Sequence, residues 1–452
     1  MRLPVTLSLA LIAVGMLRAE APTLEGTMPE DYIPELKPLL QTAVERSPST
    51  IYASIGTLQA EAAKISAYSI LYPSLNVNSD YQKSKEATST SQSSTSSGLF
   101  YNVGVGQPIF QWGAYKNSAL IGKLGLKIAE RQYAEAYRLL ASSIREQYMG
   151  LIGKNIQMRN ARFNQKLAEV EVQAAQAKFE SGSSSQAELQ TFQLALEQTK
   201  LDCDRAVEDF ANSKRAFTRL VGIDDLPDDS IPLMVPHPEY SAPKADAILV
   251  GFVGEGVEST FQSQVYQMEI KQQDLSYQVQ RVRLLPKVAA SASYSYENYT
   301  AASVGSVSQV GISSESYAVS ANWNIFDGFA TRAGKLSALE SKRSVERQKK
   351  TYVDSTIDTI TYMRRQIEFS SRALSLSEIH HALIDAEVKR LSGEKTLGYA
   401  SQASIDLGLQ TLYATEFQMS EARADLLGRW TDFISLAGID PALSNISPRY
   451  VR

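Results

Sequence analysis

The side chains best suited to chemistry are few and scattered along this chain. Its histidines are His237 and the adjacent pair His380 and His381, and its one cysteine is Cys203. Successive helical positions point about 100° apart, so the histidine pair cannot easily share a metal ion. Carboxylates mix with Lys and Arg, as in residues 340–346, which is typical of a solvated helix face. No nucleophile stands beside a base, and the sequence predicts no enzyme, no metal centre and no cofactor.

The composition of the chain argues against further classes of function. A single cysteine allows no intramolecular disulfide, and none follows the N-terminal segment to carry a lipid. The formal net charge of −4 leaves no broad basic surface, so no nucleic-acid partner is expected. Beyond the N-terminus, no run approaches the ~18 to 20 apolar residues of a membrane-spanning helix. Such a chain would meet a bilayer only as a barrel or at its surface.

The elements that position these residues occur twice. Leu220-Val221-Gly222-Ile223 returns as Leu436-Ala437-Gly438-Ile439, and Ile109-Phe110 returns as Ile325-Phe326, about 216 residues later. A duplicated unit of this length exceeds the periods of solenoid repeats. We therefore expect each copy to be a complete assembly of helices and strands, and the two to lie side by side about a pseudo-symmetry axis.

The N-terminus has the features of an export signal. Met1-Arg2 precede an apolar run over residues 5–17, and Ala19-Glu20-Ala21 has the small-x-small pattern of a cleavage site. Together with the duplication, this signal predicts five parts. They are a signal peptide at 1–21, a first repeat at 22–223, a connector at 224–247, a second repeat at 248–440 and a C-terminal tail at 441–452.

Each copy contains two segments in which apolar and polar residues alternate, the period of a strand. Four strands of about ten residues are expected, long enough to cross a bilayer when tilted. One face is apolar and aromatic, and the other carries Ser, Asn and Gly. The residues predicted to face lipid are Tyr81, Tyr101, Val103, Val105, Tyr294, Tyr296, Tyr317, Val319 and Trp323. A soluble β-sandwich would also bury one face, but the strand length favours a membrane.

The strands also predict an assembly. Residues 83–97 and 298–316 are rich in Ser and Thr and are expected to be exposed, mobile loops joining the strands of each pair. Four strands cannot close a barrel, and lipid does not tolerate unpaired sheet edges. Two copies would give a barrel nearly filled by side chains, whereas three would give twelve strands around a pore.

A long helix follows each strand pair, from Ala114 to about Glu180 and from Ala330 to about Ser392. Each has the length of a rod of ~100 Å. Shorter helical segments precede the pairs, at 33–70 and 260–283. The return helices carry an apolar seam spaced three and four residues apart, with Cys203 on it at the position of Met419 in the second copy. Cys203 is therefore expected to be a packed apolar residue.

The helical hairpins have recognisable tips. Gly182 and Gly398 interrupt the helical pattern, and glycine suits the left-handed residue that ends a helix. Ser185 and Ser401 follow three residues later and are expected to cap the return helices.

Several of these motifs together resemble the TolC-like outer-membrane efflux family. They are Gln107-Pro108-Ile109-Phe110 with Gly113, Trp323-Asn324-Ile325-Phe326-Asp327-Gly328, the two tips, the helix endings at Gly222 and Gly438, and Ser47-Pro48. The resemblance covers nearly all of the chain after residue 21. It implies a mainly helical homotrimer whose strands form a twelve-stranded barrel in the outer membrane, with a helical barrel extending into the periplasm of a Gram-negative-type bacterium. The partners implied are a periplasmic adaptor docked on the tips Gly182, Ser185, Gly398 and Ser401, an inner-membrane transporter, and outer-membrane lipid.

The chain departs from the family at the periplasmic aperture. Some members carry a ring of aspartates six and nine residues after the second glycine, where this chain has Ser404 and Leu407. Asp406 lies between these positions, and Glu188 stands at the six-residue offset in the first copy. Glu188, Ser404 and Asp406 are the candidate aperture residues, and the sequence leaves open whether the aperture carries an acidic ring.

The leading hypothesis is a passive exit duct of a tripartite efflux pump or a type I secretion system. A non-transporting periplasmic coiled-coil scaffold would explain the helices but not the aromatic-faced strands. A secreted hydrolase would explain only the export signal. The cargo, whether drugs, metals or polypeptides, is left open, because in such systems the inner-membrane transporter selects it.

Overall fold

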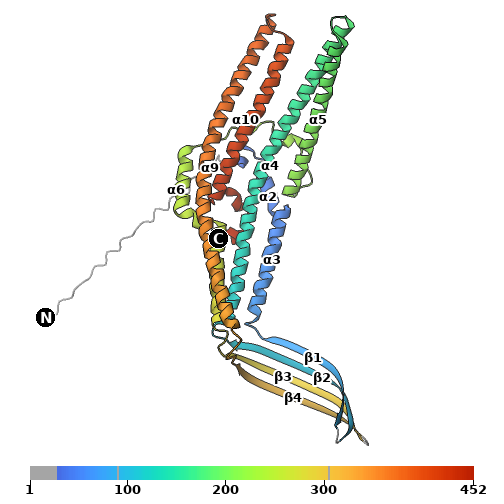
Figure 1. Cartoon of the computed structure of the whole chain (residues 1–452), viewed down its shortest axis with the longest axis vertical. Coiled ribbons are helices and arrows are strands. Elements are labelled where there is room, and N and C mark those ends of the chain that lie inside the picture. The colour runs from blue at the N-terminus through green and yellow to red at the C-terminus, as the bar shows by residue number, and fades with distance from the viewer. Residues whose placement is uncertain (1–27, 89–90, 304–305, 452) are drawn as a thin grey trace, which may run out of the picture.

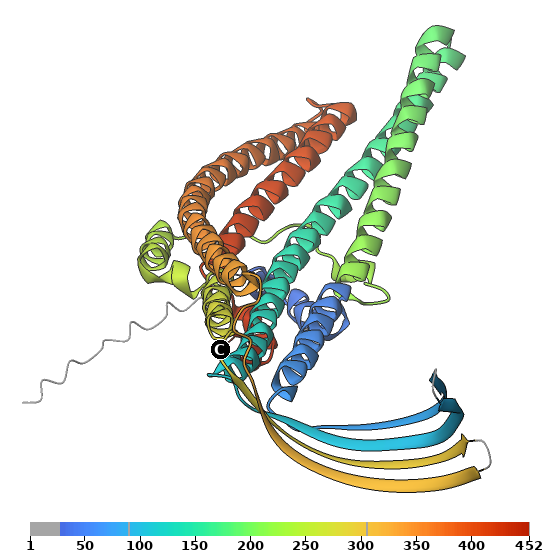
Figure 2. The ribbon, with the colours of Figure 1, turned by 60° about the horizontal axis from the view of Figure 1, so that its bottom comes forward.

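The computed structural model describes residues 28–88, 91–303 and 306–451. The predicted signal peptide at 1–21 lies outside these residues. Long helices stand nearly parallel above a four-stranded sheet at one end of the molecule (Figure 1), and the sheet is strongly curved (Figure 2). Within the described chain, no helix combines the length and hydrophobicity that a bilayer crossing requires.

Both repeats follow the same order of helix, strand pair and helical hairpin. The first repeat consists of α1 (Pro29–Tyr32), α2 (Leu36–Arg46), α3 (Pro48–Ser69), β1 (Ser74–Thr88), β2 (Ser91–Phe110), α4 (Ala114–Glu180) and α5 (Gln186–Val221). After η1 (Asp228–Ser230) come α6 (Ala242–Gly251), η2 (Phe252–Gly256), α7 (Val257–Ser259) and α8 (Phe261–Arg281). The second strand pair and hairpin are β3 (Lys287–Ser303), β4 (Ser306–Asn322), α9 (Ala330–Thr396) and α10 (Gln402–Leu436), followed by η3 (Pro441–Asn445) and α11 (Pro448–Val451).

The sheet is antiparallel throughout, in the order β1-β2-β3-β4. Because paired residues share a face, its register tests the predicted apolar surface. Val103 pairs with Val77 and Tyr294, and Tyr101 pairs with Tyr296. Every predicted residue within a strand falls on this one face, including Tyr81, Val105, Tyr317 and Val319. Trp323 follows the last residue of β4, so its side chain lies beyond the strand.

The prediction that residues 83–97 and 298–316 form loops is wrong. Lys83 pairs with Ser97 and Asn298 pairs with Gly311, so both hairpins continue as strands far beyond the apolar segment. The strands have 15 to 20 residues rather than about ten. Polar composition misled the prediction, because backbone pairing does not require an apolar face, and Thr favours strands through its β-branched side chain. Residues 89–90 and 304–305 lie outside the described part.

The helices form a curved wall. On one side of α4 lie α3 near the sheet and α5 farther away, and on the other side lie α8 and α10; α9 packs against α8 and α10 at the far edge. Both α4 and α9 have 67 residues and start where the sequence predicts, and α9 runs a few residues past Ser392. The seam is confirmed: Cys203 and Met419 are buried at equivalent positions of α5 and α10.

Most of the core lies at mid-height. One buried cluster joins the middle of α4 to α2, to the end of α5 and to η3, and the second joins α9, α10 and α6. The segment between the repeats packs into the first cluster through Leu226, Ile231 and Val235. Beyond these clusters the hairpins are held mainly by their seams.

The repeat also appears in the backbone torsions. Gly182 and Gly398 have φ of +74° and +84°, as predicted for left-handed helix ends, and Gly222 and Gly438 have +83° and +79°. In addition, the turns between sheet and helix contain Trp112 with Gly113 and Gly328 with Phe329, all at positive φ. The two repeats thus share one turn geometry but place glycine at different positions in it.

Gly222 and Gly438 provide a matched test of packing at equivalent positions. A Cβ on Gly222 would lie 2.2 Å from the carbonyl oxygen of Arg46, whereas at Gly438 it would meet nothing within 4 Å. Gly438→Ala should therefore cost only the left-handed strain, ~1 kcal/mol, while Gly222→Ala adds overpacking and should cost ~2 to 5 kcal/mol. Urea unfolding of the two variants measures the difference; equal costs would contradict the close approach of α2 to this turn.

Candidate functional site

The two hairpin tips lie at the end of the molecule farthest from the sheet (Figure 1). At the first, the Gly182 N–H donates to the Phe179 carbonyl (2.9 Å) and Ser183 to Lys178 (2.8 Å). At the second, Gly398 donates to Lys395 (3.0 Å) and Tyr399 to Glu394 (2.9 Å). These bonds satisfy the last carbonyls of α4 and α9, which have no partner in a helix of their own.

The predicted serine caps are confirmed. Ser185 Oγ accepts from the backbone N–H of Glu188 (3.2 Å), and Ser401 Oγ accepts from that of Ser404 (3.1 Å). Each tip is therefore a rigid turn between two capped helices.

The candidate aperture residues lie on separate hairpins. Glu188 accepts from Ser184 Oγ (2.9 Å) in the first tip, and Asp406 accepts from Gln402 (2.7 Å) in the second. No hydrogen bond joins Glu188 to Ser404 or Asp406 in the described part of the chain, and the hairpins stand apart in Figure 1. A single chain thus does not bring these three residues together.

The tips differ in surface chemistry, which the sequence patterns did not single out. The first is a polar run from Ser181 to Ser185, whereas the second exposes Leu397, Tyr399 and Leu407. The sequence does contain evidence of this difference, because Leu397, Tyr399 and Leu407 all lie within nine positions of Gly398. A helical periodicity search overlooks it because these residues lie off the seam.

The histidines are dispersed. His237 Nδ1 is 2.9 Å from Glu378 Oε1, His381 Nδ1 is 3.3 Å from Thr415 Oγ1, and His380 is exposed. Over residues 28–88, 91–303 and 306–451, no group of three His, Cys, Asp or Glu residues is arranged to bind a metal. Arg423 and His237 together hold the pKa of Glu378 below its ordinary value despite partial burial.

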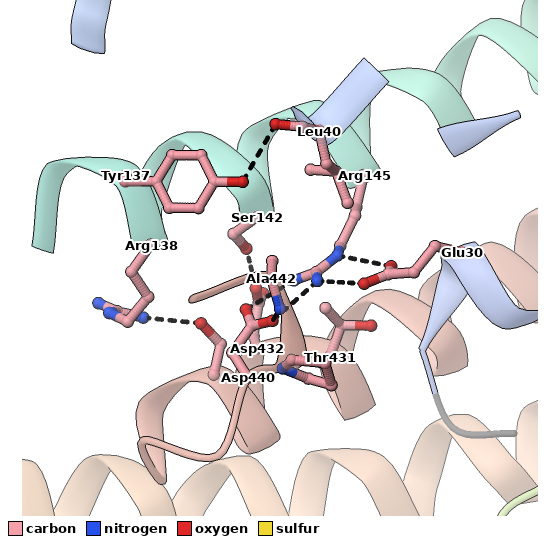
Figure 3. A network of polar contacts seen from close by, with 12 residues as sticks. Glu30, Leu40, Tyr137, Arg138, Ser142, Arg145, Thr431, Asp432, Asp440 and Ala442 are labelled. Carbon is pink, nitrogen blue, oxygen red and sulfur yellow. Dashed lines mark hydrogen bonds and ion pairs between the residues drawn. The ribbon is translucent and has the colours of Figure 1, made fainter. Parts of the chain in front are cut away.

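A buried arginine clamp holds the middle of the wall (Figure 3). Arg145 of α4 has a side chain only 1% exposed and donates to two carboxylates from distant parts of the chain. It reaches Glu30 of α1 at 2.9 and 2.6 Å and Asp440, before η3, at 2.7 and 2.8 Å. Burial alone would lower the pKa of Arg145, but these bonds and charges outweigh it and raise the pKa.

Neighbouring polar contacts reinforce this clamp. Asp440 Oδ1 also accepts from the Ala442 N–H (2.9 Å). The hydroxyl of Tyr137 donates to the Leu40 carbonyl (3.1 Å) and accepts from Asn445 (3.1 Å), and burial raises its pKa to about 12. Segments before α2 and after α10 are thereby tied to one face of α4.

These features define a class of protein: a chain of two repeats in which the sheet and the wall of long helices both have unpaired outer edges. The model of the family described as outer membrane efflux protein matches residues 39–222. Over these residues, which form most of the first repeat, the chain has the sequence pattern of that family.

Solved structures with the same fold cover nearly the whole chain. The Campylobacter jejuni CmeC outer membrane channel aligns with a TM-score of 0.70 at 15% identity, covering 100% of this chain and 97% of that one. The open state of the Neisseria gonorrhoeae MtrE outer membrane channel gives 0.66 at 15%, covering 90% of each. The Vibrio cholerae outer membrane protein VceC gives 0.63 at 15%, covering 90% and 97%. No curated protein matches the sequence closely.

Removing the arginine of the clamp should destabilise the wall. Arg145→Met leaves Glu30 and Asp440 buried without a cation, so the free energy of unfolding should fall by ~3 to 5 kcal/mol. Arg390 is the control, because it also bonds two carboxylates, Glu387 and Glu394, but is 52% exposed. Arg390→Met should change stability little.

Urea unfolding of both variants gives the comparison. The triple variant Arg145→Met/Glu30→Gln/Asp440→Asn should recover part of the loss, since it removes the unpaired charges. Equal stability of the two single variants would show that the clamp does not hold the terminal segments.

Proposed function

We propose that this chain is one protomer of an outer-membrane exit duct, which passively conducts substrates from a periplasmic adaptor and an inner-membrane transporter to the exterior. The observation that carries the proposal is that the protomer is open at both edges in the sheet and in the helical wall at once. Because the sheet and the helical wall both have unpaired outer edges, the structure is complete only when further copies of the chain cover those edges.

The sheet supplies the first part of the argument. β1 and β4 each pair on one side only, so both outer edges present backbone N–H and C=O groups without strand partners in the described chain. In lipid such groups have no water to bond. β4 of one protomer would therefore pair with β1 of the next, and three protomers would supply twelve strands.

The helical wall supplies the second part. At one edge, α9 exposes Tyr362, Phe369, Leu376 and Leu383, spaced seven residues apart as in a coiled-coil seam. At the other edge, α3 exposes Tyr52, Leu58 and Ile65, and α5 exposes Leu194 and Leu201. Two different apolar edges favour a head-to-tail contact, which closes into a ring when the rotation per protomer fits.

The exposed apolar face of the sheet supports a lipid environment. Its residues from Leu75 to Val319 lie on one continuous face, and Tyr81, Tyr317 and Val319 are among the most exposed. The opposite face carries Asn76, Asn102 and Ser293. An apolar exterior around a polar interior is the arrangement of a water-filled barrel in a membrane. A periplasmic scaffold without transport would leave this face in water, and the sheet therefore disfavours that alternative.

The tips are the proposed adaptor contact, with Gly182, Ser185, Gly398 and Ser401 holding their shape. Glu188, Ser404 and Asp406 would come together only across protomers, around the periplasmic aperture. CmeC and MtrE, which share the fold, are outer membrane channels, and this supports the same role here.

A charge on the edge of α9 tests the assembly. Leu376→Asp buries a carboxylate in the proposed interprotomer contact and should convert most of the trimer to monomer in mild detergent. Leu139→Asp is the control, because Leu139 is similarly exposed but lies on α4, which is flanked by helices on both sides. Light scattering after size exclusion measures the mass; an intact Leu376→Asp trimer would place the contact elsewhere.

A second test concerns the tips. Gly182→Val or Gly398→Val should leave a folded trimer in the outer membrane, since a Cβ there meets nothing within 4 Å, but should abolish export by distorting the turn. Gly438→Val is the control, because it imposes the same left-handed strain in open space away from the tips. Export in a deletion strain is measured together with trimer yield and adaptor crosslinking. Full export by both tip variants would remove the tips from the proposed docking site.

A further inference from the structure

The two turns between sheet and helix carry a surface feature that the duct itself does not require. In the first, Phe110 and Trp112 pack with ring centroids 5.3 Å apart, and in the second Phe326 and Phe329 pack at 5.4 Å. All four side chains are exposed, by 46% to 68%. The pairs occupy corresponding places in the two repeats, so the feature was retained twice.

These aromatic residues are held in an unfavourable backbone conformation. Trp112 (φ +51°) and Phe329 (φ +67°) are the non-glycine residues with positive φ in the described chain. Each adjoins a glycine, Gly113 or Gly328, that adopts the same region freely. Trp112 is 50% and Phe329 65% exposed, so burial within the protomer does not account for the strain. Strain of this kind points to a role at the surface.

Cations accompany the aromatic pairs. Lys116 and Arg332 hold the equivalent third position of α4 and α9, where the helix dipole disfavours positive charge. Both are exposed, as is Arg281 at the end of α8, and none of the three has a hydrogen-bond or ion-pair partner among the described residues. The neighbouring carboxylate, Asp327, accepts from the N–H and Oγ1 of Thr331, and these bonds hold its pKa down.

The cations and aromatics belong to one surface. Trp112 Nε1 donates to the carbonyl of Pro286 (3.1 Å). Pro286 lies in the connection between α8, which ends at Arg281, and β3. Phe110 pairs with Val288 on the apolar face of the sheet, so this face runs directly into the aromatic pair. The order from sheet to helix is therefore apolar, aromatic and cationic. This is the order of side chains across the interface between hydrocarbon and lipid headgroups.

We propose that Lys116, Arg281 and Arg332, together with the two aromatic pairs, form a collar that binds the phosphate groups of anionic phospholipid in the adjoining leaflet. The inference rests on the proposed function, in that the sheet lies in a bilayer. Unpartnered cations at the level where that bilayer ends are complementary to its headgroups. Each basic residue near an anionic membrane surface increases binding to that surface about fivefold. The aromatic pairs fix the depth at which the cations meet the phosphates.

The double variant Lys116→Gln/Arg332→Gln tests the collar. Folding should be retained, because the substitution removes charges that oppose the helix dipoles. The control, Lys166→Gln/Arg365→Gln, removes one exposed cation without a described partner from each of the same helices, far from the sheet. The mature chain and both variants are reconstituted in nanodiscs of equal phosphatidylglycerol and phosphatidylethanolamine, and native mass spectrometry counts the lipids retained.

The unmodified chain and the control should retain phosphatidylglycerol preferentially, and Lys116→Gln/Arg332→Gln should lower that preference at least about fivefold. Excess inorganic phosphate should leave the preference unchanged; displacement by it would indicate a free-anion site and overturn the lipid assignment. An undiminished preference in the double variant would also overturn it. If the unmodified chain inserts but shows no preference, only the collar fails, whereas failure to insert would remove the proposed duct as well.

Discussion

The backbone hydrogen bonds at the edges of the sheet impose the constraint on which the rest of this structure depends. β1 and β4 leave one side of each strand without a strand partner, and in the proposed lipid environment no water could bond to these backbone groups instead. The requirement for neighbouring copies then extends to the helical wall, because α9 at one edge follows β4 along the chain and α3 at the other edge precedes β1. Closure of the sheet and closure of the wall are thus one event in the proposed assembly.

The duplication makes that closure geometrically simple. Each repeat contributes two strands and a hairpin whose long helix has 67 residues, so the two repeats supply equal numbers of strands and long helices to the sheet and to the wall. The repeats are not interchangeable, however. Gly222 is pressed against the backbone of Arg46, while Gly438 faces open space. The first tip is serine-rich, while the second exposes Leu397, Tyr399 and Leu407. The two repeats therefore share one backbone arrangement but present different surfaces.

The features that the sequence could predict are those set by local periodicity and turn chemistry. Alternation placed Val103 and Tyr294 on one face, the pattern break at Gly398 located a left-handed turn, and the seam located Cys203 correctly. The lengths of the strands could not be predicted, because Ser and Thr carry no apolar pattern, although their backbones pair as well as any others. The Arg145 clamp could not be predicted, because the burial of Arg145 depends on Glu30 and Asp440, more than a hundred residues away on either side. No local pattern records such a contact.

The distribution of buried contacts divides the molecule mechanically. Both apolar clusters and the Arg145 clamp lie at mid-height, where segments from both ends of the chain are fixed to α4. Toward the tips, burial narrows to single seam residues such as Leu189 and Ile405. Local opening free energy follows buried contact density, so the hairpins above the clamp can bend at lower cost than the core at mid-height. In the proposed duct, the hairpins above this level would be the part that opens at the periplasmic end, while the clamp would keep the terminal segments fixed to α4.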